Sequence, residues 1–308
     1  MISAEKSSDT VTSLLAVGLE ENFIEICGDQ EYRWVHDKVQ EAVLSRDEAV
    51  NASFQFQIGT ALYYSLNEKQ LEETLFDIAD LVNKGNISKR PEFSQLNLRS
   101  AEKAQSISAF HSAAKYAANG IRLLPSEKWT SHRALTLQLY TIGAQVALTL
   151  GHGEAAEAYS NEVLNRNDCS TMETLPLRMA KAAKLCTMDL KFNETIEMSL
   201  KLLKELGCNM LWSRATAPVQ AITTLMRTIK MAKKAPAPKD IYKTLGTMTE
   251  PKHLAIIDLL SRLCYACYNA ENIFLSVLGI CKIVEMTLKY GVSDVCAPAF
   301  AGLGMMAL

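Results

Sequence analysis

Cys264 and Cys267 have the C-x-x-C spacing that zinc sites and redox-active thiol pairs use. A structural zinc site needs four ligands, and the sequence offers no second pair of cysteines or histidines at a suitable distance. A redox pair needs a thioredoxin-like setting, which the sequence does not predict. Because the two cysteines lie three positions apart in an apolar helical segment, we interpret them as small side chains at close-packing positions.

His36 and Asp37 could do a different chemistry, since a histidine followed by an acid at the start of a helix is typical of phospho-accepting sites. Such a site needs a following helical hairpin and a Gly-rich ATP-binding domain, and the sequence shows neither. The alternative is a helix start in which Asp37 is the N-cap and Gln40 completes a capping box. We favour this second interpretation.

The chain contains none of the motifs that mark the common catalytic and nucleotide-binding sites. The Gly-x-x-x-x-Gly-Lys-Ser/Thr phosphate loop, Gly-x-Gly-x-x-Gly, Gly-x-Ser-x-Gly, the kinase His-Arg-Asp loop and His-Glu-x-x-His are all missing. We therefore predict that the chain is not an enzyme and that it holds no catalytic residue, cofactor or metal ion.

Composition and charge bound the remaining function classes. The 308 residues are 48% hydrophobic and 21% charged, and 32 basic residues face 34 acidic ones, which gives no electrostatic footprint for nucleic acid. The eight cysteines are scattered, as in reduced intracellular proteins. There is no secretory signal, and the longest apolar stretch, residues 295–308, is shorter than the roughly 20 residues that span a membrane. These features predict a cytoplasmic protein with no membrane contact.

Two groups of basic residues were considered as binding sites. The lysines and arginines between residues 84 and 103 are interpreted as a solvated face, with a groove for phosphate or acidic groups as the alternative. Four lysines lie near prolines and are interpreted as part of an exposed linker, namely Lys230, Lys233, Lys234 and Lys239.

The elements that would position these residues begin with a small N-terminal region, residues 1–66. A short helix, two strands around Gly28 and a second helix give the outline of a partial winged-helix segment with one β-hairpin. Residues 20–40 carry more acids than bases, so we expect contact with a neighbouring domain rather than with DNA. Asn67, with Gln70 three residues later, predicts a capped helix over residues 67–82, which ends at Gly85.

Small residues recur along residues 67–308 at the spacing that tetratricopeptide-type repeats use where paired helices approach closely. The repeat positions eight, eleven, twenty and twenty-seven fall on Ala101, Ala104, Ala113 and Gly120. Further copies give Ala144, Ala147 and Ala156, then Ala183 and Cys186, and finally Cys264 and Cys267. The starts of the copies are 43, 39 and 81 residues apart, which leaves room for one degenerate unit near residues 212–250.

The helices of these repeats are predicted at residues 134–150, 154–165, 195–206, 252–268 and 272–290. Each exposes an apolar stripe that only stacking on its neighbours can bury. The fold class is therefore mainly α, a tetratricopeptide-like α-solenoid preceded by the winged-helix segment. Residues 293–308 resemble the first helix of another unit without its partner, so we expect the chain to be a fragment, truncated at its C-terminus.

The run from Tyr32 to Ala42 resembles a signature of large multidomain signalling ATPases of the STAND type. The signature positions are Tyr32, Arg33, His36, Asp37, Val39 and Gln40. Further matches follow in order at 75–79, 96–101, 113–116 and 248–251. These proteins join an AAA-related ATPase to a serine/threonine kinase domain and a sensor histidine kinase.

The resemblance implies that residues 1–66 are the winged-helix end of the ATPase module and that residues 67–308 are the repeats that follow it. It also implies that the nucleotide-binding and kinase residues lie outside this chain. Our leading hypothesis is a non-catalytic regulatory scaffold that contacts proteins, among them other domains of the same signalling protein. The alternative is a transcription-type regulator with a DNA-binding winged helix and ligand-sensing repeats.

Overall fold

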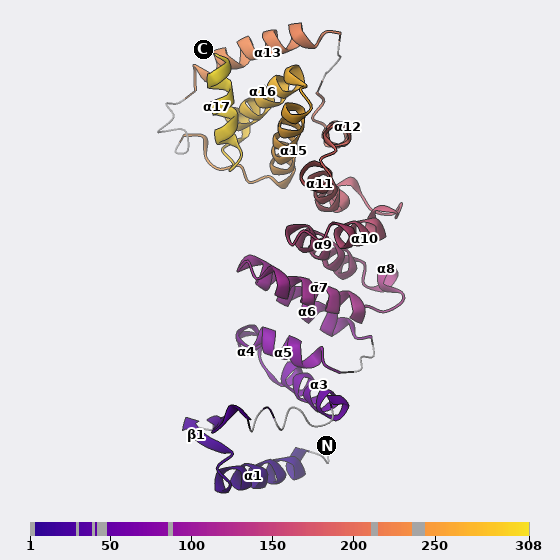
Figure 1. Ribbon diagram of the computed structural model, residues 1–308, viewed down its shortest axis with the longest axis vertical. Coiled ribbons are helices and arrows are strands. Elements are labelled where there is room, and N and C mark those ends of the chain that lie inside the picture. Colours follow the sequence, from indigo (N-terminus) through magenta and orange to yellow (C-terminus); the bar gives the residue numbers. More distant parts are fainter. Residues whose placement is uncertain are drawn as a thin grey trace. The chain divides into compact units, whose positions relative to one another are not determined.

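The computed structural model describes residues 4–28, 31–38, 41, 48–85, 89–210, 215–235 and 244–307. Over these residues the protein is mainly helical, with a single two-stranded antiparallel sheet. Contacts group the chain into two compact units, Met1–Ser100 with Arg122–Ser126 and Ala101–Ile121 with Glu127–Leu308, which are described separately. Figure 1 labels the elements.

The first unit begins with α1 (Ala4–Glu20), which packs against β1 (Ile24–Gly28). β1 pairs with β2 (Glu31–Trp34) in antiparallel register, with Ile24 opposite Trp34, and a bulge lies between Ile26 and Gly28. The predicted hairpin is therefore confirmed. Residues 29 and 30 of its turn lie outside the described residues.

Helices α3 (Glu48–Ser65), α4 (Glu68–Glu73) and α5 (Leu75–Val82) follow, then α6 (Pro91–Ser106), which begins in the first unit. Asn67 and Gln70 form the predicted capping box. The helix predicted over residues 67–82 is divided at Thr74 into α4 and α5. Because α3 packs against α5, residues on both sides of position 66 share one compact unit. The proposed domain boundary there stays a prediction.

The core of the first unit is built from apolar side chains of α5 and α6. Ile78, Ala79, Val82 and Phe93 are fully buried. Gly59 of α3 lies so close to α5 that an added Cβ would come within 2.7 Å of the Leu81 Cβ. A glycine is needed there because any larger residue would push the two helices apart.

The second unit is a succession of helices over its described residues. They are α7 (Phe110–Leu123, whose last residues belong to the first unit), α8 (Lys128–Ser131), α9 (Arg133–Thr149), α10 (Gly153–Leu164), α11 (Thr171–Thr187), α12 (Phe192–Glu205), α13 (Ala217–Ala232), α15 (Pro251–Asn269), α16 (Ile273–Tyr290) and α17 (Cys296–Met306). The helices predicted from residue 134 onward are confirmed to within a few residues at each end.

Several helices of this unit pack against more than one other helix. α9 contacts α10 and α11, α11 contacts α12 and α15, and α16 contacts α13, α15 and α17 (Figure 1). Gly151 and Gly207 lie in the turns that directly follow α9 and α12, and each has a left-handed φ of 79°. A continuous core runs through α11, α12, α15 and α16, with Leu203, Leu259, Leu263 and Val284 fully buried.

The degenerate segment near residues 212–250 contains one full helix among its described residues, α13, with Pro218 in its first turn. Lys230 lies inside this helix and Lys233 is its C-cap, so the prediction of a linker at Lys230 is wrong. Pro236, Pro238 and Lys239 lie outside the described residues.

Candidate protein-binding groove

The N-terminus of α11 is fixed by a capping box that the sequence encodes locally. Ser170 is the N-cap, and its hydroxyl accepts a hydrogen bond from the Glu173 backbone N–H at 3.3 Å. In return, the Ser170 backbone N–H donates to Glu173 Oε2 at 2.8 Å. This reciprocal pairing satisfies N–H groups that a helix start would otherwise leave unpaired.

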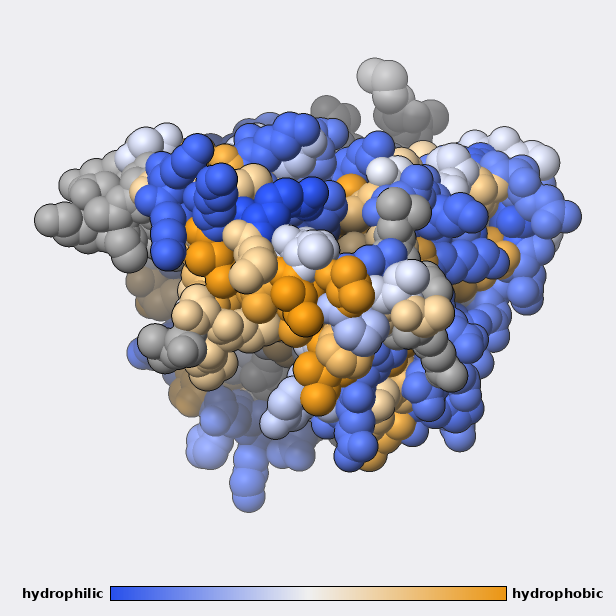
Figure 2. All heavy atoms as spheres, turned by 90° about the horizontal axis from the view of Figure 1, so that it is seen from above, coloured by the Kyte–Doolittle hydropathy of each residue, from blue (hydrophilic) through white to orange (hydrophobic). Residues whose placement is uncertain are grey.

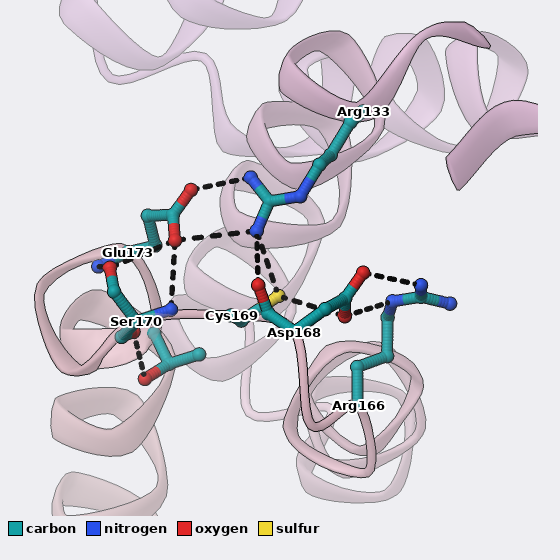
Figure 3. A network of polar contacts seen from close by, with 7 residues as sticks. Arg133, Arg166, Asp168, Cys169, Ser170 and Glu173 are labelled. Carbon is teal, nitrogen blue, oxygen red and sulfur yellow. Dashed lines mark hydrogen bonds and ion pairs between the residues drawn. The ribbon is translucent and has the colours of Figure 1, made fainter. Parts of the chain in front are cut away.

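Arg133, the first residue of α9, joins this helix start to the preceding loop (Figure 3). Its Nη1 lies 2.5 Å from Glu173 Oε1, and its Nη2 donates to the Asp168 carbonyl oxygen at 3.0 Å. The hydrogen bonds from Arg133 and from Ser170 lower the pKa of Glu173 from 4.5 to about 2. The carboxylate is therefore charged at any physiological pH, and α9 and α11 stay connected.

Arg166 belongs to this loop itself, two residues after α10 ends at Leu164. Its guanidinium binds the Asp168 carboxylate through two hydrogen bonds of 2.9 and 2.7 Å, and it lies 4.4 Å from the centroid of the Trp129 ring (Figure 3 shows the carboxylate contact). Trp129 also stacks on Tyr140 of α9, with ring centroids 6.1 Å apart. The loop between α10 and α11 is thus held from α8 by Trp129 and from α9 by Arg133.

A second ion pair supports the aromatic residues. Lys128 Nζ lies 2.7 Å from the Tyr140 hydroxyl and 3.0 Å from Glu162 Oε1. Burial opposes the charge on Lys128, but the hydrogen bonds to Tyr140 and Glu162 outweigh it and raise its pKa. Because each polar group here is held by several partners, we interpret the cluster as a positioning device for α11 and not as a reaction site.

Beside this helix start lies a groove of about 510 Å³ between α9, α11 and α15. We call it the α11 groove. Its lining is mostly apolar and comprises Gln145, Leu148, Thr149, Met172, Leu175, Pro176, Met179, Ala180, Ala183, Pro251, Ala255, Asp258 and Arg262. Small residues on facing helices, Ala180, Ala183 and Ala255, leave the room that the groove occupies.

Three features make the α11 groove suited to binding. Met172 lies one residue before Glu173 and is 47% exposed, so a large flexible apolar side chain is presented next to a rigid helix start. Pro176 has no N–H, so the Met172 carbonyl lacks its usual donor within the helix. Asp258 and Arg262 pair with each other at 3.1 Å, which leaves the groove apolar with a neutral polar edge. Such a surface fits the apolar side of a peptide or helix.

A smaller hollow of about 320 Å³ lies between α10, α11 and the start of α12. Lys184 lies there within 3.2 Å of Glu157 and 3.0 Å of Asp189, and these contacts raise its pKa. The charge of Lys184 is already neutralised by these two carboxylates, so Lys184 is not open to an anionic ligand.

The small residues predicted at close-packing positions are buried or, in one case, partly buried. Ala101, Ala104, Ala113, Ala144, Ala147, Ala156, Ala183, Cys186 and Cys267 are at most 7% exposed, Gly120 is buried, and Cys264 is partly buried. Ala183 lines the α11 groove. The Cys264 sulfur lies 2.5 Å from the position of a Cβ built on Gly279, so α15 and α16 approach closely at this point. That these positions form a repeat stays a prediction.

All eight cysteines are free thiols, and the described residues contain no group of three or more His, Cys, Asp or Glu side chains able to hold a metal ion. Burial raises the pKa of Cys264 and of Cys267 to about 12, so both thiols are protonated. Neither is prepared for nucleophilic or redox chemistry, because the thiolate is the reactive form.

The signature residues of the N-terminal region lie on its surface. Tyr32, Arg33, His36 and Asp37 are exposed, and Arg33 pairs with Glu25 across the hairpin. Val39 and Gln40 lie outside the described residues, so the capping box of Asp37 and Gln40 stays a prediction. The α11 groove was not predicted, although the Ser170-x-x-Glu173 pattern at its edge is a readable capping box.

Comparisons with known proteins give one informative match. No model of a protein family matches the chain, and no solved structure does. The chain is similar to "Hybrid signal transduction histidine kinase G" of Dictyostelium discoideum, with 23% identity over 320 aligned positions that cover 89% of this chain and 9% of that protein. The similarity supports a signalling context and leaves most of the Dictyostelium protein unmatched. Over the described residues, no helix combines the length and apolar character needed to cross a membrane.

Proposed function

We propose that this chain is a non-catalytic, tetratricopeptide-like helical scaffold that regulates a signalling ATPase or kinase through protein contacts made in the α11 groove. The observation that carries the proposal is the groove itself, an apolar depression of about 510 Å³ whose edge is fixed by the Arg133–Glu173 pair. The similarity to a hybrid signal transduction histidine kinase supports the signalling context.

A rigid groove favours binding because less conformational entropy is lost when the partner docks. The capping box and Arg133 hold α11 in place before any partner arrives, and Met172 adapts its shape to the incoming side chains. In this proposal the STAND-type ATPase and kinase chemistry belongs to other parts of the signalling assembly, in the cytoplasm. The chain itself performs no reaction.

Site-specific crosslinking tests the proposal. A photoreactive amino acid placed at Met172 should crosslink the chain, in cells, to a histidine kinase or ATPase polypeptide identified by mass spectrometry. The matched control is the same substitution at Met188, which is 39% exposed at the end of α11 and does not line the groove. Met172→Asp should weaken the captured complex about tenfold, because a buried charge replaces an apolar contact. Equal crosslinking at both positions, or crosslinks to no signalling protein, would refute the proposal.

The alternative of a DNA-binding winged helix gains no support from the described residues. β1 and β2 carry Glu25 and Glu31, and their arginine, Arg33, is paired with Glu25. A strand pair with excess negative charge repels the phosphate backbone.

A further inference from the structure

Helix α13 presents an apolar stripe to solvent. Val219, Ile222 and Met226 are 67%, 57% and 69% exposed, and they recur at the three- and four-residue spacing that places side chains on one face of a helix. The opposite face is already used, since Ala217, Ala221 and Thr228 are buried and α13 packs on α16. Figure 2, which views the structure from the side where α13 lies, shows apolar residues gathered into a patch with hydrophilic residues around it.

Positive charge continues the same face toward the C-terminal end of the helix. Lys230 and Lys233 follow Met226 at the same helical spacing, and Lys234 lies beside them; all three are exposed. No acidic residue occurs in α13. Of the cations in this part of the described chain, Arg227 pairs with Glu285 at 2.5 Å, whereas Lys230, Lys233 and Lys234 have no ion pair with any described residue.

We propose that this surface, the α13 face (Val219, Ile222, Met226, Lys230 and Lys233), docks an acidic amphipathic helix of a partner protein, which lies antiparallel to α13. The apolar residues occupy the first half of the face and the lysines the second half. An antiparallel helix places its apolar stripe over Val219, Ile222 and Met226 and its own first turn over the lysines. Acidic residues in that first turn pair with the lysines of α13. They also interact favourably with the positive end of the partner's own helix dipole.

The order of the residues favours a helix over a lipid surface. Helices that lie on anionic membranes carry basic residues along the whole polar side and large apolar or aromatic residues along the other. In α13 the two kinds of residue are separated along the helix axis, and its exposed face contains no aromatic residue. A partner helix can carry its apolar residues and its acidic residues in two successive segments that face the two halves of α13. A uniform bilayer surface has no such division along the helix axis.

A charge-swap experiment on the full 308-residue chain tests the α13 face. The probe is a labelled 18-residue synthetic peptide of helical pattern with leucines on one face and glutamates in its first turn, and binding is followed by fluorescence anisotropy. A second peptide has lysines in place of the glutamates. The acidic peptide should bind, and its affinity should fall as salt is raised from about 0.05 to about 0.3 M, because exposed charges are screened.

The variants make the assignment specific. Met226→Asp should weaken the acidic peptide at least about tenfold. The double variant Lys230→Glu/Lys233→Glu should lose the acidic peptide and gain the lysine-bearing one. Met172→Asp and Met188→Asp, on α11, should leave binding unchanged, which separates the α13 face from the α11 groove. Circular dichroism confirms that each variant is folded.

Three results would overturn the proposal: no binding of the acidic peptide, equal loss of binding in Met172→Asp, or failure of the charge swap in a folded double variant. Sedimentation with phosphatidylserine vesicles completes the test. Binding to vesicles without binding to the acidic peptide would assign the face to a membrane surface instead.

Discussion

Replacing Gly279 of α16 by alanine tests whether close approach of α15 and α16 depends on small residues. The new methyl group would lie 2.5 Å from the Cys264 sulfur, about 1 Å inside an ordinary contact between carbon and sulfur. Cys264 also lies 3.7 Å from the Ser276 carbonyl oxygen, so rotation of its short side chain would give up that contact. The substitution therefore forces either the sulfur or the helix to move.

The expected magnitude is the difference between two opposing effects. Overpacking a close contact costs about 1–3 kcal/mol. Glycine to alanine inside a helix gains up to about 1 kcal/mol, because alanine loses less backbone entropy. Gly279→Ala should therefore destabilise the protein by about 0–3 kcal/mol. In a Cys264→Ala background the clash is gone, and the same change should stabilise by up to about 1 kcal/mol.

Urea unfolding gives the free energies, and hydrogen exchange of the α15 and α16 amides locates the change. Gly304→Ala in α17 is the matched control, because an added Cβ there meets no atom within 4 Å. Gly304→Ala should show the stabilisation that alanine gives inside a helix without the destabilisation caused by overpacking. If Gly279→Ala has the same effect with and without the Cys264 sulfur, close packing at this position is not the cause and our interpretation of Cys264 is wrong.

Two further predictions concern titratable groups. In the folded protein Cys264 and Cys267 should not react with a thiol reagent at pH 8, because their pKa values are about 12, whereas the exposed Cys27 should react; rapid labelling of all three before unfolding would contradict the burial described above. The pKa of Glu173 is lowered to about 2 on folding, so its contribution to stability is present above pH 4.5 and lost as pH falls toward 2. Arg133→Gln should raise the midpoint of Glu173 in a carbon-13 NMR titration, and a midpoint that stays at about 2 would show that Arg133 is not the main cause.

Local signals predicted the elements well because helix and hairpin formation depends on short stretches of sequence. The capping pattern of Asn67 and Gln70 and the alternating apolar residues around Gly28 each specify a structure within a few residues. The helix predicted over residues 195–206 ends as expected, and Gly207 follows it with φ of 79°. Gly85 was expected to do the same, yet it does not have a positive φ.

The reason for Gly85 lies in a contact that no local pattern reveals. A Cβ at this position would come within 2.6 Å of the Phe56 ring, so glycine is needed for the approach of a residue almost 30 positions earlier in the chain. The α11 groove depends on the same kind of information. Its lining comes from three helices separated by up to about 100 residues, and their spacing depends on packing between them.

The amino-acid sequence by itself determined the helices, the hairpin and the missing catalytic motifs, because each of these is encoded by residues close together in the chain. Tertiary structure decided that Met172 borders an apolar groove, that Arg133 reaches Glu173 across 40 residues, and that the outer side of α13 is left exposed. An amphipathic pattern shows that a helix has an apolar face, but only the packed neighbours show whether that face is covered.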